Sequence, residues 1–360
     1  MSDTKINITF VLPSLVAGGA ERVISFIAQN IDAEKFNSTI LITGHQKDTV
    51  YPIENIKVEY LEKKRVLNAV SKLFMYLTTR KPDVVLSSIG HLNTVMGLMS
   101  PCFPKIKFVI REASVVSAMN SINRIKRTIT IFNKLRSVMS HLSYKLVDNI
   151  ICQSKDMADD FIAIYKVPKQ KLAIINNPIT QTLPLFKVKE PSSEIVKFIT
   201  VGRLSEEKGQ LRILKLLSKL KFKFHYTIIG TGPLKTKIFE AIQIYNLTTN
   251  ITYIPFTSNI SKYMSSSDLF LQGSYVEGFP NTVLESCFFG TPVLAFNVPG
   301  GTKEIIIHKE NGYLAETEEE YEFYLNNRLN LTPTEIRKSV TDRFDKLKII
   351  KQYETLFTIL

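Results

Sequence analysis

The sequence predicts an α/β protein made of two doubly wound units, each a parallel sheet covered by helices on both faces. Short runs of β-branched and other apolar residues alternate with segments of helical periodicity along the whole chain. These runs are continuously apolar, as expected of strands buried on both faces. Strand–helix alternation with short connections favours parallel strands joined by right-handed crossovers. The length of 360 residues fits two domains of about 100–200 residues each.

The expected strands follow one another in a regular order. In the first half they are Ile6–Leu12, Thr39–Thr43, Lys57–Leu61, Asp83–Ser87, Lys107–Ile110, Asn149–Cys152 and Leu172–Ile175. In the second half they are Lys197–Val201, Tyr226–Ile229, Ile251–Ile254, Asp268–Gln272 and Pro292–Phe296. A stretch with Pro184, Pro191 and two serines separates the halves. We therefore expect a first domain over residues 1–180, a linker over 181–194 and a second domain over 195–342.

Positive charge is concentrated in the first half of the chain. Lys and Arg number 46 against 33 Asp and Glu, and the net charge of +13 divides into +10 for residues 1–180 and +3 for residues 181–360. Such an excess indicates an anionic partner, which can be nucleic acid, anionic lipid or a phosphorylated small molecule. Nucleic acid is disfavoured, because the chain has no cluster of aromatic and basic residues and no Trp.

The cysteines and the apolar segments indicate in which cellular compartment the protein is expected. Cys102, Cys152 and Cys287 lie far apart and lack Cys-x-x-Cys spacing, so we expect reduced thiols and neither a disulfide framework nor a zinc site. The first residues lack the pattern of a secretion signal. No run approaches the roughly 18–20 apolar residues that cross a bilayer. We expect a cytoplasmic protein that can still lie on a membrane surface.

A pair of glycines follows the first expected strand. Gly18 and Gly19 precede a helix with Val23, Ile24 and Ile27 on its apolar face. Glycines before a helix allow close approach of backbone, and a helix N-terminus attracts anions. A tight strand–helix turn that simply needs small residues explains the pair equally well.

Two cations follow the first strand of the second half. Arg203 comes directly after that strand, and Lys208 lies five residues on, before the next helix. A forked guanidinium and a compact ammonium suit a diphosphate. The alternative is a solvated loop in which Glu206 and Glu207 neutralise both cations. The later turn Gly230-Thr231-Gly232-Pro233 lacks the third glycine of a dinucleotide-binding fingerprint, which disfavours a dehydrogenase.

The most informative segment covers residues 277–285. Gly278 permits a bend, Pro280 makes the entry rigid, and a helix is expected from about Asn281 to Phe289. Glu277 falls in the loop and Glu285 in the helix. For Glu285 a capping box with Thr282 is an alternative explanation. Glu277 has no such alternative, so we expect it to meet hydroxyl groups.

Taken in order, these segments resemble glycosyltransferase family 4. The resemblance rests on residues 18–22, 201–209, the Glu277 and Glu285 pair, and Pro299-Gly300-Gly301-x-x-Glu304-Ile305. It implies the GT-B fold, with two Rossmann-like domains facing across a cleft and a C-terminal helix, residues 343–360, that returns to the first domain. It also implies retaining transfer from a nucleoside-diphosphate sugar without a bound metal or other cofactor. In keeping with this, the sequence has no Asp-x-Asp motif.

The resemblance also implies roles for individual residues. Arg203, Lys208 and Glu277 would be catalytic, the two cations stabilising the leaving diphosphate and Glu277 meeting sugar hydroxyls. Glu285 would hold the ribose hydroxyls. The rest of the donor-binding set implied by the resemblance is Gly18, Gly19, Gly278, Phe279, Pro280 and Asn281.

On the acceptor side the chain departs from the family pattern. Many relatives carry a histidine where this chain has Ala113. Arg111 and Glu112 precede that position, and His91 and Asn93 follow the preceding strand. We expect these four residues to serve the acceptor, with Glu112 and His91 close together.

The expected partners follow from the family and the charge. From the resemblance we expect a UDP-sugar as the donor, with GDP-mannose as the alternative. We expect the acceptor to be lipid-linked or a polysaccharide. Residues 120–146 predict a basic amphipathic helix or helix pair, which we expect to lie on the anionic inner face of the cytoplasmic membrane. A sugar-nucleotide epimerase or hydrolase on the same fold remains an alternative.

Overall fold

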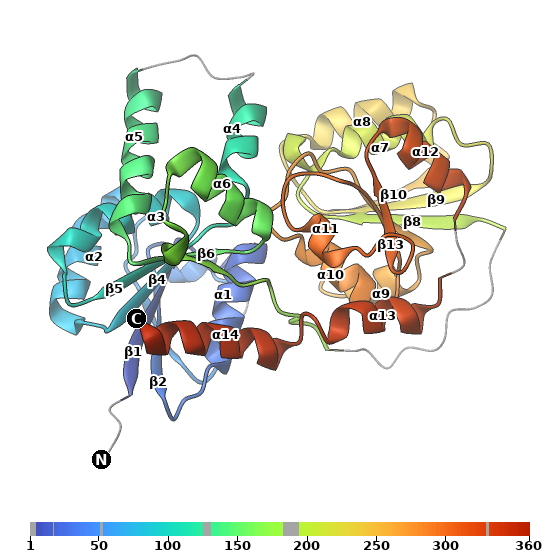
Figure 1. Cartoon of the computed structure of the whole chain (residues 1–360). Helices are drawn as coiled ribbons and strands as arrows, with labels where there is room; N and C mark the ends of the chain where they lie inside the picture. The colour runs from blue at the N-terminus through green and yellow to red at the C-terminus, as the bar shows by residue number, and fades with distance from the viewer. Residues whose placement is uncertain (1–4, 17, 51–52, 125–130, 183–193, 329–330) are drawn as a thin grey trace. The chain divides into compact units, whose positions relative to one another are not determined.

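The computed structural model describes residues 5–16, 18–50, 53–124, 131–182, 194–328 and 331–360. The chain divides into two compact units, each built on its own sheet (Figure 1). Unit 1 comprises Met1–Ser117, Arg124–Thr180 and Lys346–Leu360, and unit 2 comprises Ala118–Asn123 and Gln181–Asp345. Most of the expected linker, residues 183–193, lies outside the described residues.

Unit 1 holds a sheet of seven strands that pair in parallel. The strand order is β3-β2-β1-β4-β5-β6-β7. All seven lie where the sequence predicted them, because continuously apolar runs fill both faces of the sheet. Their bounds are β1 Ile6–Leu12, β2 Phe36–Ile42, β3 Lys57–Tyr60, β4 Val84–Ser88, β5 Lys107–Arg111, β6 Asn149–Cys152 and β7 Leu172–Ile174.

Helices alternate with these strands, as right-handed crossovers require. They are α1 Gly19–Asn30, α2 Val66–Arg80, α3 Gly90–Met99, α4 Val116–Arg124, α5 Ile131–Leu146 and α6 Lys155–Tyr165, with short 3₁₀ turns at Gln46–Asp48, Ser100–Cys102 and Lys169–Lys171. Most of α4, Ala118–Asn123, is grouped with unit 2. The expected basic segment 120–146 is therefore a helix pair, α4 and α5, whose connection lies outside the described residues.

The last helix, α14 (Lys346–Ile359), belongs to unit 1. Phe357 packs edge-on against Phe10 of β1 and Phe36 of β2, with ring centroids 6.1 and 6.3 Å apart. Glu354 accepts a hydrogen bond from the backbone N–H of Asp32 at 2.9 Å. The expected return of the C-terminal helix to the first domain is confirmed.

Unit 2 holds six parallel strands in the order β10-β9-β8-β11-β12-β13. The last strand was not predicted, because four residues that begin with Gly312 carry little strand signal. Pairing with β12, Val293 opposite Gly312, makes it a strand. The bounds are β8 Val196–Val201, β9 Phe224–Ile229, β10 Ile251–Ile254, β11 Leu269–Gln272, β12 Val293–Phe296 and β13 Gly312–Ala315.

The helices of unit 2 cover both faces of this sheet. They are α7 Gln210–Leu217, α8 Lys235–Ile244, α9 Ile260–Ser265, α10 Asn281–Phe288, α11 Thr302–Ile305, α12 Glu318–Asn326 and α13 Pro333–Thr341, with 3₁₀ turns at Glu206–Lys208 and Thr248–Asn250. Two such doubly wound sheets confirm the predicted fold class.

Each sheet has one point at which the direction of winding reverses. In unit 1 this point lies between β1 and β4, and in unit 2 it lies between β8 and β11. In open parallel sheets, ligands bind outside the carboxyl ends of the strands at this reversal. The loops after β8 and β11 are therefore the first place to look for a site in unit 2.

Candidate functional site

The loops that follow β8 and β11 touch through their backbones at two glycines. A Cβ atom on Gly209 would lie 1.8 Å from the carbonyl oxygen of Gly273, and Gly209 has a positive φ of 62°. The backbone N–H of Tyr275 also donates to the carbonyl of Glu207 at 2.8 Å. Because no side chain separates the loops here, the residues beside this contact are brought within bonding distance.

The contact places Lys208 against Glu277. The Lys208 Nζ lies 2.8 and 2.9 Å from the two carboxylate oxygens of Glu277. Ser274 Oγ and Gln272 Nε2 also donate to Glu277 Oε1, at 2.5 and 3.2 Å. Glu277 is only 7% exposed, so its charge is held by these three donors and little by water. Ser274 and Gln272 were missed by sequence reasoning, although Gln272 ends the strand that leads to Glu277 and Ser274 lies in the loop after it.

Arg212 of α7 fixes the loop that carries Ser274. Its guanidinium donates to the carbonyl of Gly273 at 2.5 Å and to the carbonyl of Ser274. It also lies over the rings of Tyr275 and Phe296, 4.0 and 3.5 Å from their centroids. A half-buried cation that donates to two carbonyls and lies over two rings restrains this loop.

A third loop, after β12, holds the backbone of Glu277 in place. The N–H of Glu277 donates to the carbonyl of Pro299 at 3.0 Å, and the N–H of Gly301 donates to the carbonyl of Gly278 at 2.7 Å. Gly300 has a φ of 121°, and a Cβ there would lie 1.9 Å from the Glu277 carbonyl oxygen. This close approach explains the paired glycines after Pro299 in the sequence.

The helix α10 begins at Asn281 with Pro280 at its N-cap, and no side chain caps it. Thr282 is therefore inside the helix, and the capping box suggested for Thr282 and Glu285 is not formed. Glu285 is a buried carboxylate, 4% exposed, that accepts a hydrogen bond from Gln181 Nε2 at 3.3 Å.

Phe279 anchors the turn between Glu277 and α10. Its buried ring packs against Phe344, with centroids 5.2 Å apart and planes at 67°. The turn of residues 278–280 is thus held by apolar packing, while its backbone pairs with the loop after β12.

Arg203 differs from the other predicted catalytic residues. It lies at the carboxyl end of β8 with an exposed side chain. No described side chain forms a hydrogen bond or ion pair with its guanidinium, whereas its carbonyl accepts from Gln210 Nε2 at 2.9 Å. The ion pair of Lys208 is with Glu277, so the alternative in which the neighbouring glutamates neutralise both cations is wrong.

The turn at Gly230–Pro233 is structural. The carbonyl of Thr231 accepts from the N–H of Leu204, and the carbonyl of Leu204 accepts from the N–H of Leu234, both at 2.9 Å. These bonds tie the turn to the loop after β8.

In unit 1, Glu112 is the centre of a buried hydrogen-bond network. Its Oε1 accepts from Asn93 Nδ2 at 2.8 Å and from the hydroxyl of Tyr144 at 3.3 Å. Burial raises the pKa of Glu112, and the Asn93 and Tyr144 hydrogen bonds oppose that rise. Ser87 Oγ donates to Asn93 Oδ1 at 2.9 Å, which completes the link from β4 to β5.

The other two predicted acceptor residues have different surroundings. Arg111 is fully buried, and its guanidinium donates to the hydroxyl of Tyr353 at 3.1 Å and to Asn177 Oδ1. His91 is exposed in the first turn of α3, and burial and the nearby Arg136 lower its pKa. Among the described residues, the side-chain hydrogen bonds of Glu112 are with Asn93 and Tyr144, and none is with His91.

The turn that leads into α3 holds a strained residue that the sequence did not reveal. Ile89 follows β4 at the reversal point of the unit 1 sheet and has a φ of 84°. A β-branched residue in this conformation costs about 1–3 kcal/mol and is typical of functional turns.

Gly18 is the N-cap of α1, and Gly19 is the first residue of that helix. The carboxylate of Glu21 folds back over Gly18, with its Oε2 2.1 Å from the position that a Cβ there would take. Burial raises the pKa of Glu21, and a hydrogen bond from its own backbone N–H opposes the rise. A side chain at residue 18 would therefore require the Glu21 carboxylate to shift, and the expected role of Gly18 toward the donor stays a prediction.

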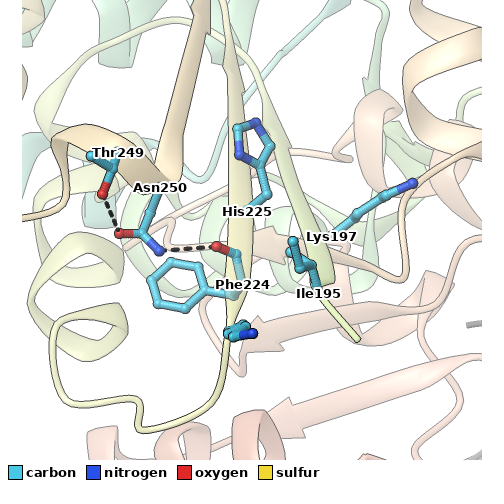
Figure 2. A pocket seen from close by; sticks show the side chains of 7 residues that line it. Ile195, Lys197, Phe224, His225, Thr249 and Asn250 are labelled. Carbon is cyan, nitrogen blue, oxygen red and sulfur yellow. Dashed lines mark hydrogen bonds between the residues drawn. The ribbon is translucent and has the colours of Figure 1, made fainter. Parts of the chain in front are cut away.

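A pocket lies at the amino ends of the strands of unit 2, whereas the candidate site follows their carboxyl ends (Figure 2). It is lined by the amino ends of β8 and β9, with Lys197, Phe224 and His225, and by Asn250 before β10. Asn250 Nδ2 donates to the carbonyl of Phe224 at 3.0 Å. None of the predicted site residues lines this pocket, so it is separate from the candidate site.

Comparisons with known proteins agree with the expected family. Residues 17–182 match the family described as Glycosyltransferase Family 4, and residues 185–336 match the one described as Glycosyl transferases group 1. The chain is 25% identical over 358 residues to N-acetylgalactosamine-N,N'-diacetylbacillosaminyl-diphospho-undecaprenol 4-alpha-N-acetylgalactosaminyltransferase of Campylobacter jejuni, covering 94% of this chain and 95% of that one.

Solved structures share the fold at low identity. Sucrose-phosphate synthase from Thermosynechococcus elongatus superposes with a TM-score of 0.82 at 15% identity, over 98% of each chain. Anabaena HepE in complex with UDP-glucose superposes with a TM-score of 0.79 at 18% identity, over 99% of this chain and 100% of that one.

Proposed function

The chain belongs to glycosyltransferase family 4, and from this premise we propose that it transfers a hexose or N-acetylhexosamine, with retention, from a UDP-sugar to a lipid-linked or polysaccharide acceptor. The observation that supports this most directly is the Lys208–Glu277 pair, held at the reversal point of the unit 2 sheet by three converging loops. The C. jejuni relative, by its name, acts on a diphospho-undecaprenol acceptor. The Anabaena relative was solved with UDP-glucose.

The proposed chemistry is stabilisation of the leaving diphosphate. Arg203 is the forked donor to phosphate oxygens, and Lys208 adds a compact charge. An ammonium has three N–H donors, and two of those of Lys208 go to the Glu277 oxygens, so one is left for a phosphate oxygen. Charge that develops on the diphosphate in the transition state is then met by donors already in place.

The remaining residues orient the donor. Glu277 meets sugar hydroxyls, with the backbone N–H groups of residues 278–281 around the phosphates. Glu285 accepts from the ribose hydroxyls, which justify a carboxylate at 4% exposure. Gly18 and Gly19 let the backbone at the start of α1 approach the donor and acceptor.

On the acceptor side the geometry suggests a division of labour. Asn93, Arg111 and Glu112 are buried and bonded to the protein, so they position the loops after β4 and β5. His91 is exposed at the N-terminal turn of α3 and is the member of this set that meets the acceptor.

A screen of nucleoside-diphosphate sugars tests the donor. A ligand that binds only the folded chain at 100 times its Kd stabilises it by about 2.7 kcal/mol. We expect UDP and one UDP-sugar to raise Tm, and GDP-mannose and ADP-sugars to leave it unchanged. A shift with GDP-mannose alone would replace UDP by GDP, and no shift with any nucleotide would reject the proposal. Conversion of the donor without an acceptor would favour the epimerase or hydrolase.

We further propose that unit 1 lies on an anionic membrane surface through α5, at the inner face of the cytoplasmic membrane. Leu135, Val138, Met139, Leu142 and Leu146 recur at helical spacing on this helix and are 37–62% exposed. Residues 113–147 contain six Lys and Arg and no Asp or Glu. A stripe of apolar residues in a segment whose charges are all positive is typical of helices that lie at the surface of an anionic bilayer. No helix in the described part of the chain is long and apolar enough to span a membrane.

Vesicle co-sedimentation tests this surface. We expect binding to vesicles that contain phosphatidylglycerol, weaker binding at high salt, and little binding to pure phosphatidylcholine, because each Lys or Arg near an anionic surface adds about 1 kcal/mol. Leu142→Asp on α5 should reduce binding at least tenfold. Ile244→Asp changes an apolar residue of α8 that is even more exposed, 74% against 47% for Leu142, and as the control it should have no effect. Equal binding by both variants and the wild type would rule out α5 as the membrane surface.

A further inference from the structure

The carboxylate of Glu285 is bonded to a residue at the start of unit 2 that no motif pointed to. Gln181 is the first residue of the main segment of unit 2, and its side-chain amide Nε2 lies 3.3 Å from Glu285 Oε1. Gln181 is half-buried, whereas Glu285 is almost fully buried. An amide that donates to one carboxylate oxygen restricts the directions in which the other lone pairs point.

The residues that precede Gln181 along the chain are buried in unit 1. Asn177, four residues earlier, is 2% exposed and accepts a hydrogen bond from the buried guanidinium of Arg111. Ile179, between them, is 7% exposed. These contacts belong to unit 1, whereas the hydrogen bond between Gln181 and Glu285 lies within unit 2.

From this geometry we infer that Gln181 is a positioning residue for the donor nucleotide, because it orients the Glu285 carboxylate toward the ribose hydroxyls. The inference rests on the proposed role of Glu285. Residues that hold a ligand-binding group from behind commonly set its affinity as strongly as a direct contact does. The effect of Gln181 should therefore appear only with ligands that have ribose hydroxyls for Glu285 to accept from.

The test is a thermodynamic cycle of two ligands and four proteins. Calorimetry measures the Kd of UDP and of 2′,3′-dideoxy-UDP for the wild type, Gln181→Leu, Gln181→Glu and Glu285→Gln. We expect the wild type to bind UDP at least tenfold more tightly than the dideoxy ligand. Gln181→Leu should lose about three- to tenfold in UDP affinity and nothing in dideoxy-UDP affinity. Gln181→Glu should lose more UDP affinity, because a second carboxylate repels Glu285.

The control and the adverse outcomes separate this inference from the proposed function. Gln243→Leu makes the same change at an exposed glutamine of α8 and should match the wild type. Glu285→Gln can lose the preference of the wild type for UDP over dideoxy-UDP while Gln181→Leu keeps it in full. That result would reject the positioning role of Gln181 and leave the role of Glu285 in place. Equal losses for both ligands in Gln181→Leu would also reject positioning. A wild type without any preference would reject the role of Glu285 and this inference with it.

Discussion

Arg203→Ala is expected to lower the transfer rate by about 10²–10³-fold, the usual cost of removing one group that stabilises transition-state charge, while leaving Tm unchanged. The guanidinium is exposed and has no bonding partner among the described side chains, so its removal breaks nothing in the unliganded fold. Surface changes of this kind typically alter stability by less than about 0.5 kcal/mol. Initial rates of transfer and a thermal melt of the same preparation measure both quantities.

Two comparisons make the Arg203 result interpretable. Lys237→Ala removes an exposed cation from α8 and should keep full activity, so a general effect of net charge is excluded. Arg203→Lys keeps the charge but loses the fork, and we expect partial activity. The diphosphate role would be contradicted if Arg203→Ala kept wild-type kcat/KM, or if it lost activity only in proportion to a fall in Tm.

Lys208 and Glu277 are expected to behave in the opposite manner, since their replacement affects both activity and stability. Lys208→Met leaves a carboxylate that is 7% exposed without its counter-ion. Removal of one partner from a buried pair costs about 3–5 kcal/mol. Here Lys208 is 31% exposed, and Ser274 and Gln272 still donate to Glu277, so we expect about 2 kcal/mol. Transfer should fall at least 100-fold, since Lys208 is proposed to contact the diphosphate.

A double-mutant cycle with Glu277→Gln isolates the pair. Glu277→Gln alone should cost about 1 kcal/mol, because a neutral amide still accepts from Ser274 but no longer compensates Lys208. In the double variant no unpaired buried charge remains, so the costs should be non-additive by about 1–2 kcal/mol. Denaturation in urea measures the three free energies of unfolding. If the changes in the free energy of unfolding were strictly additive, the two side chains would not interact in solution as they do in the structure. The double variant is expected to be inactive in either case.

Much of the fold followed from the sequence because its signals are local. Twelve strands were placed within a few residues of their observed bounds, since a strand buried on both faces must be continuously apolar. The strand that escaped, β13, is four residues long and begins with Gly312, and only its pairing with β12 makes it a strand. The capping box at Thr282 was wrong because a local sequence pattern did not decide where the helix begins. The local pattern was present, but Pro280 starts the helix two residues earlier.

The candidate site shows the same division. Arg203 and Lys208 stood out as two cations between a strand and the next helix, and Glu277 stood out as a loop carboxylate that no capping pattern explained. Their partners did not stand out. Ser274, Gln272 and Gln181 are ordinary polar residues, and their importance depends on which atoms they reach.

The order of residues along the chain was enough to predict two doubly wound sheets and the family, because periodicity, strand ends and motif spacing are properties of neighbours along the chain. The same signals gave the segments of the candidate site as a prediction. Which side chains meet was decided by tertiary contact. The glycine-to-glycine approach of the loops after β8 and β11 joins Lys208 to Glu277 across 69 residues, and an amide from the start of unit 2 reaches Glu285 across 104. Such pairings depend on how loops pack at the reversal point of a sheet. The separation of two residues along the sequence does not predict whether this packing brings them together.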